Sequence, residues 1–271
     1  MTTDAESQAN RHIRELFALD GRVALVSGGA GRYGRHISLA LAEAGATVIV
    51  ASRDLLRCEN FAAELRVAGY KAEAREFNLT NDESVRALAE ELRASVKRID
   101  VLFNNAVTVS AGSPERYSTS EWGRAMECNA TGLYRSCLVF GTFMAEQGWG
   151  SIVNIGSIYG VVSPDFSLYE GHEEMTNPPS YGFAKAGMVQ LTRYLAVYFG
   201  GRGVRVNCIS PGGLYSTNMP TDFAARYRAH TPLGRMAGPN DIKGAALFLA
   251  ADASAYVTGQ NLLIDGGFAL L

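Results

Sequence analysis

Short apolar runs alternate with longer stretches of helical periodicity along most of the chain. Short apolar runs bounded by turn residues predict strands, and the stretches between them predict helices. The clearest helix is 82–97, where an apolar stripe follows Asn81, a residue suited to cap the N-terminus. Strands are predicted at 22–27, 46–51, 71–77, 99–103, 151–156, 203–209 and 261–264. This alternation predicts an α/β fold with a doubly wound, seven-stranded parallel sheet and helices on both faces.

A glycine-rich turn follows the first predicted strand. The apolar run 23–26 stops at the sequence Ser27-Gly28-Gly29-Ala30-Gly31-Arg32-Tyr33-Gly34, and a helical pattern begins at once. Strand, glycine turn and helix in this order are the context of a dinucleotide-binding Rossmann fold, because glycines let the backbone approach a pyrophosphate at the helix N-terminus. The alternative is a tight turn that binds no ligand.

A tyrosine and a lysine share one helical face further along the chain. Tyr181 and Lys185 lie four residues apart at the start of an apolar-periodic segment, so a helix places their side chains one turn apart. A phenol is a weak acid/base at neutral pH until a nearby cation favours its phenolate, and the lysine supplies such a cation. The spacing is also compatible with an exposed lysine beside a packed tyrosine.

Four more motifs follow the glycine turn in order. They are Asn104-Asn105-Ala106 after a strand, Asn129 in a helical stretch, Ser157 after a strand, and Pro211-Gly212-Gly213 after a strand. With Tyr181 and Lys185, these motifs resemble the short, single-domain branch of the short-chain dehydrogenase/reductase family. The resemblance implies one Rossmann-fold dehydrogenase domain, 19–271, after an N-terminal extension, 1–18, in which a short helix is expected at 13–17.

The resemblance implies roles for these residues. Tyr181 is the general acid/base, Lys185 lowers the pKa of the phenol and binds the nicotinamide ribose, and Ser157 holds the substrate oxygen. Asn129 either holds a water that links Lys185 to solvent or is a structural, helix-bending asparagine. The expected cofactor-binding residues are Ser27, Gly28, Gly31, Arg32, Tyr33, Gly34, Ser52, Arg53, Asn78, Leu79, Asn105, Ala106, Tyr181, Lys185, Pro211, Gly212 and Thr217.

Three features depart from the pattern of the family. Arg32 occupies the place of a middle glycine, so the glycine spacing resembles that of the longer, sugar-nucleotide-modifying branch, although the chain lacks the length for a second lobe. Val107 follows Asn-Asn-Ala in place of a glycine, so that turn is either reshaped or in a different dihedral region. Ser157 and Tyr181 are farther apart than usual, and the excess forms an active-site insert, 163–179.

The end of the second predicted strand indicates the cofactor. An acidic residue there would bind the adenosine ribose hydroxyls and repel a 2′-phosphate, which favours NAD. Here Ser52 and Arg53 take that place, and a hydroxyl beside a guanidinium suits a phosphate, with Arg32 as a second cation. The sequence therefore predicts NADP rather than NAD, unless Arg53 pairs with Asp54 or Glu59 on the surface.

The insert lies between two expected catalytic positions, so its ends must lie at the active site. It is either a solvated surface loop or a polar wall that binds substrate hydroxyls. Its polar side chains are Asp165, Tyr169, Glu170, His172, Glu173, Glu174 and Asn177. The segment 214–231 is expected to cover the same substrate: Tyr215 and Asn218 would meet hydroxyls, and Ser216 or Thr217 would reach the nicotinamide carboxamide or a phosphate.

These features predict an oxidoreductase for a hydroxylated small molecule, a sugar, sugar acid or polyol. The segment 16–21 also resembles sugar-acid dehydrogenases such as gluconate 5-dehydrogenases. The alternative with the same chemistry is a 3-ketoacyl or general carbonyl reductase, for which polyol turnover is not expected. A non-catalytic nucleotide-binding sensor is the other alternative, but a sensor has no need for Ser157, Tyr181 and Lys185 together.

Composition and charge narrow the partners. The net charge of −2 gives no electrostatic reason to bind nucleic acid or an anionic membrane. No apolar run reaches the ~18 residues that span a bilayer, and the first twenty residues lack a signal-like apolar core. The four cysteines have neither metal-ligand nor redox-motif spacing, which predicts free thiols, no metal site and a cytoplasmic protein.

The helical segments 120–147 and 181–200 carry more apolar residues than one sheet face needs. The resemblance implies that these helices pair with their copies across a two-fold axis, giving a homotetramer or a homodimer. Inward packing of the same residues is the alternative. The residues concerned are Leu133, Leu138, Val139, Phe140, Phe143, Leu195, Val197, Tyr198 and Phe199.

Overall fold

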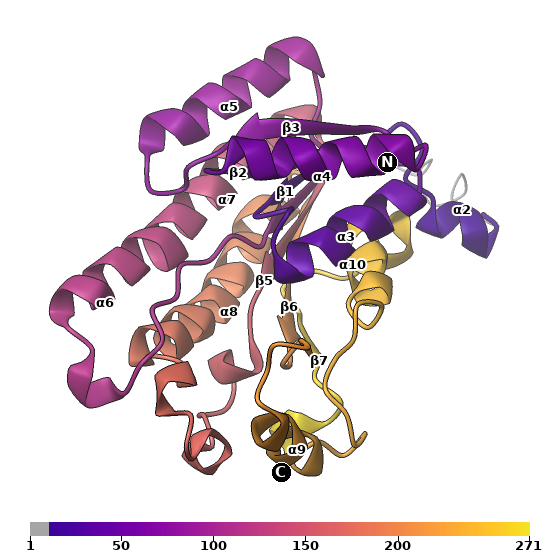
Figure 1. The fold of residues 1–271 in the computed structure, drawn as a ribbon. Helices are drawn as coiled ribbons and strands as arrows, with labels where there is room; N and C mark the ends of the chain where they lie inside the picture. Colours follow the sequence, from indigo (N-terminus) through magenta and orange to yellow (C-terminus); the bar gives the residue numbers. More distant parts are fainter. Residues whose placement is uncertain (1–10) are drawn as a thin grey trace.

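Seven parallel strands form one sheet in the order β3-β2-β1-β4-β5-β6-β7. The computed structural model describes residues 11–271, and the sheet lies between layers of helices (Figure 1). The strands are β1 Val23–Ser27, β2 Thr47–Ser52, β3 Ala72–Glu76, β4 Val101–Asn104, β5 Gly150–Ile155, β6 Val204–Pro211 and β7 Asn261–Ile264. The predicted α/β class and parallel sheet are confirmed, and each strand boundary was predicted to within two residues.

Each face of the sheet is covered by helices that bury an apolar stripe. Helices α3, α4 and α10 share one core with the sheet, and α5, α7 and α8 share the other. Their bounds are α3 Arg32–Glu43, α4 Leu55–Val67, α5 Asp82–Ser95, α6 Thr119–Met126, α7 Leu133–Gln147, α8 Pro179–Gly200, α9 Thr221–Ala229 and α10 Lys243–Ala250. The predicted cap is present, since the Asn81 side chain accepts a hydrogen bond from the N–H of Ser84 at 3.2 Å.

The carboxyl ends of β1 and β4 mark the point where the strand order reverses. The strands that follow β1 are added on one side of it, and those that follow β4 are added on the other side. The connections therefore leave in opposite directions and open a crevice, which is where such sheets bind ligands. The loops after β1, β4, β5 and β6 bring Gly28, Asn105, Ser157 and Gly212 to this edge.

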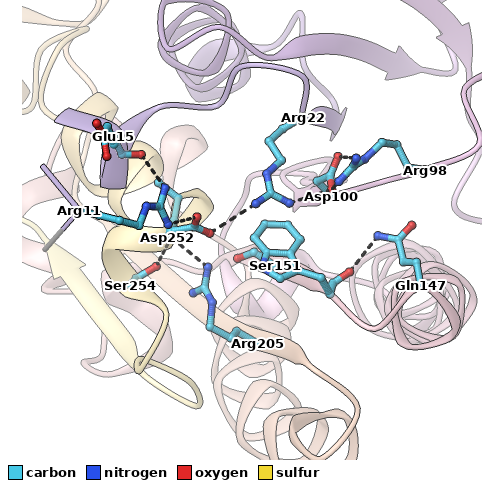
Figure 2. Close-up of polar contacts among 12 residues, drawn as sticks. Arg11, Glu15, Arg22, Arg98, Asp100, Gln147, Ser151, Arg205, Asp252 and Ser254 are labelled. Atoms are coloured by element: carbon cyan, nitrogen blue, oxygen red, sulfur yellow. Dashed lines mark hydrogen bonds and ion pairs between the residues drawn. The ribbon is translucent and has the colours of Figure 1, made fainter. Parts of the chain in front are cut away.

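The opposite edge, at the amino ends of the strands, carries a network of paired charges (Figure 2). The buried carboxylate of Asp100 accepts hydrogen bonds from the N–H of Val23 at 2.8 Å and from the guanidinium groups of Arg22 and Arg98 at 3.3 and 2.8 Å. Arg22 also lies over the ring of Trp149, 3.9 Å from its centroid. Because the buried carboxylate is fully satisfied, the network fixes the starts of β1 and β4 relative to each other.

A short helix, α2 Ile13–Phe17, packs at this amino edge, as predicted. The Phe17 ring lies 6.5 Å from that of Phe248 on α10, and Arg11 forms an ion pair with Asp252 at 2.8 Å. These contacts attach the second half of the predicted extension to the sheet domain. Its first ten residues lie outside the described residues.

Two properties of residues 11–271 concern possible partners. No helix there is long and apolar enough to cross a membrane. No group of three or more histidine, cysteine, aspartate or glutamate side chains there is arranged to hold a metal ion. The four cysteines are all buried and free.

Candidate active site

A cleft of about 970 Å³ lies along the carboxyl edge of the sheet. One end lies beside Ser52 and Arg53, where α4 begins, and the middle passes the glycine turn and Ala106. The far end is lined by Ser157 and Tyr181 and is enclosed by the insert and α9. The cleft therefore follows the crevice that the strand order creates.

The glycine turn leaves no room for side chains where it faces its neighbours. Gly28 has a φ of +62°, and a Cβ there would lie 3.0 Å from the Cα of Ala106. A Cβ on Gly34 would lie 2.1 Å from the carbonyl oxygen of Gly28, so α3 packs directly on the turn. Gly31 lines the cleft immediately before α3, whose first N–H groups have no intrahelical acceptor. This backbone cradle fits a pyrophosphate, which a helix N-terminus attracts.

Ser27 lies behind the glycine turn rather than in the cleft. Its buried hydroxyl accepts hydrogen bonds from the N–H groups of Asn105 and Ala106 at 3.1 and 3.2 Å. The side-chain amide of Asn105 in turn donates to the carbonyl oxygen of Gly28 at 2.9 Å. Ser27 and Asn105 thus tie the loops after β1 and β4 together, which keeps the floor of the cleft in shape.

Arg32 and Tyr33 reach from the first turn of α3 to the segment after β6. The guanidinium of Arg32 donates to the carbonyl oxygen of Leu214 at 2.7 Å, and the hydroxyl of Tyr33 donates to that of Gly212 at 2.8 Å. Burial raises the pKa of Tyr33, so its phenol remains a donor at neutral pH. Arg32 lines the cleft without a carboxylate partner among residues 11–271, and its charge is available to an anion.

The end of β2 places two unpaired cations on the cleft. Arg53 and Arg57 are exposed, line the cleft and form no ion pair with any described residue, so the predicted alternative pairing of Arg53 with Asp54 or Glu59 is absent. The carboxylate of Asp54 instead caps α4 by accepting the N–H of Arg57 at 3.0 Å. The hydroxyl of Ser52, which also lines the cleft, donates to the backbone carbonyl oxygen of Asp54 at 3.1 Å. A hydroxyl with two guanidinium groups fits a phosphate monoester.

Three side chains of the expected catalytic set converge at the far part of the cleft. Tyr181 and Lys185 lie one turn apart on α8, and the Nζ of Lys185 is 5.7 Å from the centroid of the Tyr181 ring. The hydroxyl of Ser157, after β5, is within hydrogen-bonding reach of the Tyr181 phenol. Gly160 permits this approach, because a Cβ there would lie 2.8 Å from the backbone carbonyl carbon of Lys185.

Burial governs the protonation of these groups. Burial lowers the pKa of Lys185 to about 8, and its ammonium donates to the carbonyl oxygen of Ile155 at 2.5 Å. Burial also raises the pKa of Tyr181, and the hydrogen bond from Ser157 opposes this effect only in part. The net direction for the phenol is therefore upward, and the expectation that Lys185 lowers its pKa stays a prediction.

A buried row of polar side chains holds α8 against the sheet. Asn154 on β5 donates to the hydroxyl of Thr192 on α8 and accepts from the amide of Asn104 on β4, both at 2.9 Å. Ser136 on α7 donates to Asn104 at 2.8 Å. Because all four side chains are buried and joined by hydrogen bonds, the row fixes α7 and α8 relative to the strands that carry the site.

Asn129 does not reach the cleft. It lies in a π-helical turn, Glu127–Gly132, between α6 and α7. Its side chain accepts a hydrogen bond from the N–H of Thr108 at 2.9 Å and donates to the carbonyl oxygen of Thr108 at 2.7 Å. Both ends of the amide thus bind one backbone residue. Of the two predicted roles, the contacts fit the structural one, and Asn129 fixes the loop at Thr108, which lines the cleft.

The insert is folded onto α9, and three of its charged side chains, Asp165, His172 and Glu173, form hydrogen bonds within the insert or to α9. Two short 3-10 helices, Phe166–Tyr169 and Glu173–Met175, give it regular structure. His172 lies 2.9 and 3.0 Å from the two carboxylate oxygens of Asp222, and Arg226 donates to two carbonyl oxygens of the insert at 3.1 and 2.7 Å. The insert is therefore structured rather than a solvated loop, and of the polar wall that the sequence predicted, Tyr169 and Asn177 line the cleft.

The predicted composition of the substrate wall is wrong in two places. The charged residues of the insert do not line the cleft; its contributions are Tyr169, Met175 and Asn177. The segment 214–231 contributes Leu214, Met219, Phe223 and Tyr227, whereas Tyr215, Ser216, Thr217 and Asn218 do not line it. Charged groups cost most in a closed pocket and least at the surface, so the chain folds with Met and aromatic side chains inward.

Most residues expected at the cofactor line the cleft. They are Gly28, Gly31, Arg32, Tyr33, Ser52, Arg53, Asn78, Leu79, Asn105, Ala106, Tyr181, Lys185, Pro211 and Gly212, whereas Ser27, Gly34 and Thr217 do not. Val107 has no positive φ, so the turn there does not need the left-handed conformation that a glycine would favour. Sequence reasoning missed Arg57 and Phe223. Both could have been predicted, because Arg57 lies four residues after Arg53 and Phe223 lies four residues before Tyr227.

Comparison with known proteins agrees with this geometry. The family described as enoyl-(acyl carrier protein) reductase matches residues 31–269. A D-threitol dehydrogenase of Mycolicibacterium smegmatis is 35% identical over 94% of this chain and 95% of its own. A galactitol 2-dehydrogenase (L-tagatose-forming) of Cereibacter sphaeroides is 34% identical over 94% of this chain and 98% of its own.

A solved structure is similar to this chain along almost its whole length. A gluconate 5-dehydrogenase from Burkholderia cenocepacia, in complex with NADP and tartrate, superposes with a TM-score of 0.87 at 28% identity and covers 96% of this chain and 100% of its own. Fold and site together define an oxidoreductase of the Rossmann type. The chain belongs to the short-chain dehydrogenase/reductase family, as its motifs predicted.

Proposed function

We propose that this chain transfers a hydride between NADP and the carbonyl or secondary-alcohol carbon of a hydroxylated small molecule, a sugar, sugar acid or polyol. The observation that carries the proposal is the convergence of Ser157, Tyr181 and Lys185 at one point of the cleft. The relatives named for threitol and galactitol support the substrate class, and the neighbour in complex with NADP supports the cofactor.

Each residue of the site has a definite task in this proposal. NADP, when bound, supplies or accepts the hydride. Ser157 holds the substrate oxygen beside Tyr181. The raised pKa of Tyr181 keeps the phenol protonated at neutral pH, so it can donate its proton to the carbonyl oxygen in reduction. In oxidation it must first lose that proton, and the phenolate then accepts the proton of the alcohol. The pKa of Lys185, near 8, allows it to exchange a proton with that phenol, and its two free ammonium hydrogens bind the nicotinamide ribose.

The remaining cleft residues hold the rest of the dinucleotide. Ser52, Arg53 and Arg57 take the 2′-phosphate, and the carboxylate of Asp54 beside them caps α4. Gly28 and Gly31 approach the pyrophosphate, and Arg32 adds a positive charge beside it. The other residues proposed to bind the cofactor are Tyr33, Asn78, Leu79, Asn105, Ala106, Pro211 and Gly212.

A 3-ketoacyl or general carbonyl reductase is the second candidate. Met175, Met219 and Phe223 favour it, because they give the substrate end an apolar surface that an acyl chain would cover. The matching family is also described by an acyl-carrier-protein reductase. The two candidates differ in one respect: only the first turns over polyols.

The proposal includes assembly and location. We infer that residues 19–271 form the catalytic domain and that it assembles as a homotetramer or homodimer in the cytoplasm, where its four thiols stay reduced. Leu133, Phe140, Phe143, Leu195 and Phe199, which were expected at the interface, are buried within the chain. Val197 and Tyr198, which were also expected there, are exposed, and an interface on α7 and α8 would rest on them together with Tyr134, Phe183 and Tyr194.

The function is tested with purified full-length protein. Absorbance of NADPH is followed with galactitol, threitol, gluconate and a 3-ketoacyl thioester, each with NADP(H) and with NAD(H), and light scattering gives the mass. Oxidation of at least one hydroxylated substrate with NADP preferred supports the proposal. Exclusive turnover of the thioester selects the second candidate, and a tenfold preference for NAD removes the cofactor assignment.

The cofactor assignment has its own test. Ser52→Asp with Arg53→Ala deletes an attraction and adds a repulsion, so the ratio of kcat/KM values should move from NADP toward NAD by about 100-fold. Arg35→Ala, an exposed arginine on α3 that pairs with Glu64, is the control and should leave the ratio unchanged. An unchanged ratio in the double variant would mean that no 2′-phosphate lies there.

A further inference from the structure

The substrate end of the cleft contains no charged side chain from residues 11–271. The charged residues that line the cleft are Arg32, Arg53, Asp54, Arg57 and Lys185. Three of them lie at the end of β2, and Lys185 lies one turn after Tyr181 on α8. The guanidinium of Arg32 reaches the segment after β6, where the carbonyl oxygen of Leu214 holds it at 2.7 Å. A carboxylate bound beyond Tyr181 would therefore lose its hydration without meeting a cation.

The nearest cations on and after α9 are used elsewhere. Arg226 donates to the carbonyl oxygens of the insert, and Arg228 donates to the carbonyl oxygen of Ala224 at 3.0 Å. His230 lies against the ring of Phe268, with centroids 4.6 Å apart, and its nitrogen is 3.8 Å from Asp165. None of these three side chains lines the cleft.

Three side chains form a hydrogen-bonded row on the wall of this end. The phenol oxygens of Tyr159 and Tyr169 are 2.8 Å apart, and the Nδ2 of Asn177 donates to Tyr169 at 3.2 Å. Tyr159 and Tyr169 are 8% and 4% exposed, so little water reaches the hydrogen-bonding groups of the two phenols that stay unpaired. Only one phenol hydrogen fits between the two oxygens; the other has no acceptor among the described residues, and the Oδ1 of Asn177 has no donor there.

The row thus offers one free donor and one free acceptor. A hydroxyl group satisfies both, because it accepts one hydrogen bond and donates another. A carboxylate only accepts, so it would leave the Oδ1 of Asn177 unpaired and close to its negative charge. Met175, Met219 and Phe223 line the same end, and they suit the C–H faces of a carbon chain or ring.

We propose that the substrate is uncharged, and that Tyr159, Tyr169 and Asn177 recognise one of its hydroxyl groups other than the one that reacts. This inference rests on the proposed oxidoreductase function and narrows it. Neutral polyols and their ketoses, or diols on a small ring, fit the site. Sugar acids do not, because their carboxylate has no partner at the substrate end.

The first experiment compares substrates in matched pairs with purified full-length protein and NADP. One set pairs threitol with threonate and galactitol with galactonate, so that only the carboxylate differs. A second set pairs 2,3-butanediol with 2-butanol, so that only the second hydroxyl differs. The neutral member and the diol should each have a kcat/KM at least ~10-fold higher, because buried hydrogen-bonding groups reject analogues that leave them unpaired.

Variants test whether the hydrogen-bonded row of side chains causes this substrate preference. Tyr169→Phe should raise KM for 2,3-butanediol about 10-fold and change kcat little, while KM for 2-butanol and the Kd for NADP, from protein fluorescence, stay unchanged. Tyr256→Phe, at a fully exposed tyrosine, is the matched control. Met175→Lys places a cation at the substrate end and should raise kcat/KM for threonate relative to threitol at least ~10-fold, with Met175→Leu as its control.

Each outcome bears on the inference. A wild-type enzyme that prefers threonate overturns it and leaves the oxidoreductase proposal standing. Equal losses for 2,3-butanediol and 2-butanol in Tyr169→Phe also overturn it, since they indicate a packing effect. If Tyr169→Phe does not fold, Met175→Lys decides, and an unchanged preference there counts against the inference. If NADP binds but no alcohol is oxidised, the proposed function itself fails, and the inference fails with it.

Discussion

Charged side chains are paired at one edge of the sheet and unpaired at the other. At the amino edge, Arg22 and Arg98 pair with the buried Asp100. At the carboxyl edge, Lys185 is buried and Arg53 faces the cleft, and neither forms an ion pair with a carboxylate among residues 11–271. A paired charge holds elements together, whereas an unpaired charge beside a cavity is available to a ligand.

Arg205 shows that an unpaired charge is not enough to indicate a site. It lies at the amino edge (Figure 2) and donates to the carbonyl oxygens of Leu249, Ala251 and Val257 at 3.0, 3.2 and 3.4 Å. Burial lowers its pKa to about 10. Three of its hydrogens are donated to backbone carbonyls, and it does not line the active-site cleft, whereas Lys185 has one acceptor and lies on that cleft. N–H hydrogens that have no acceptor and lie beside a cavity are therefore what indicates a binding site.

The largest expected effect is on chemistry at the carboxyl edge. Tyr181→Phe keeps the ring and removes the proton donor, so kcat should fall by at least ~100-fold, the scale of a lost general acid/base. The free energy of unfolding and the Kd for NADP should stay close to wild type, as measured by urea unfolding and by fluorescence titration. A Phe variant with near-normal kcat would exclude Tyr181 from the mechanism.

Asp100→Ala should show the reverse pattern at the amino edge. Removing the carboxylate leaves the N–H of Val23 without its acceptor and two guanidinium groups without their partner, although both arginines are partly exposed and regain water. We expect the free energy of unfolding to fall by about 3 kcal/mol, which is the low end of the range for breaking a buried ion pair. With the protein still folded, kcat/KM should be unchanged; a loss of activity without a loss of stability would contradict the comparison.

Lys185→Met should abolish activity yet stabilise the protein at neutral pH. Burial depresses the folded-state pKa of Lys185 from 10.5 to about 8, so between those values the unfolded chain binds more protons and wild-type stability rises with pH. The variant lacks this dependence. It should exceed wild type by about 2 kcal/mol at neutral pH, because relief of the ~3 kcal/mol burial cost is offset by the lost hydrogen bond to Ile155. Urea unfolding across this pH range should show the gap closing as pH rises.

The smallest effect is expected where a charge pair is exposed. Arg11 and Asp252 form an ion pair at 2.8 Å, with 41% and 23% of their side chains exposed. Arg11→Ala should therefore change the free energy of unfolding by no more than ~0.5 kcal/mol. An effect as large as that of Asp100→Ala would show that α2 depends on this pair for its attachment.

The fold was predictable because its signals are local. Buried parallel strands are short apolar runs, and Asn81 and the glycine turn mark where helices begin. The substrate wall depends instead on contacts between distant segments. His172 meets Asp222, and Asn129 meets Thr108, and nothing in the residues near His172 or Asn129 indicates the partner. The net direction of the Tyr181 pKa was likewise set by burial, which the spacing to Lys185 does not reveal.

The insert also bears on how fast and how tightly the substrate binds. The first of its two short helices is capped by Asp165, which accepts the N–H of Ser167, and Glu173 at the start of the second accepts the N–H of Gly171. With its contacts to α9 in place, the insert loses little conformational entropy when a ligand arrives, so affinity depends mainly on the contacts made. A single rapid binding phase, without a slow loop-ordering step, is the kinetic consequence.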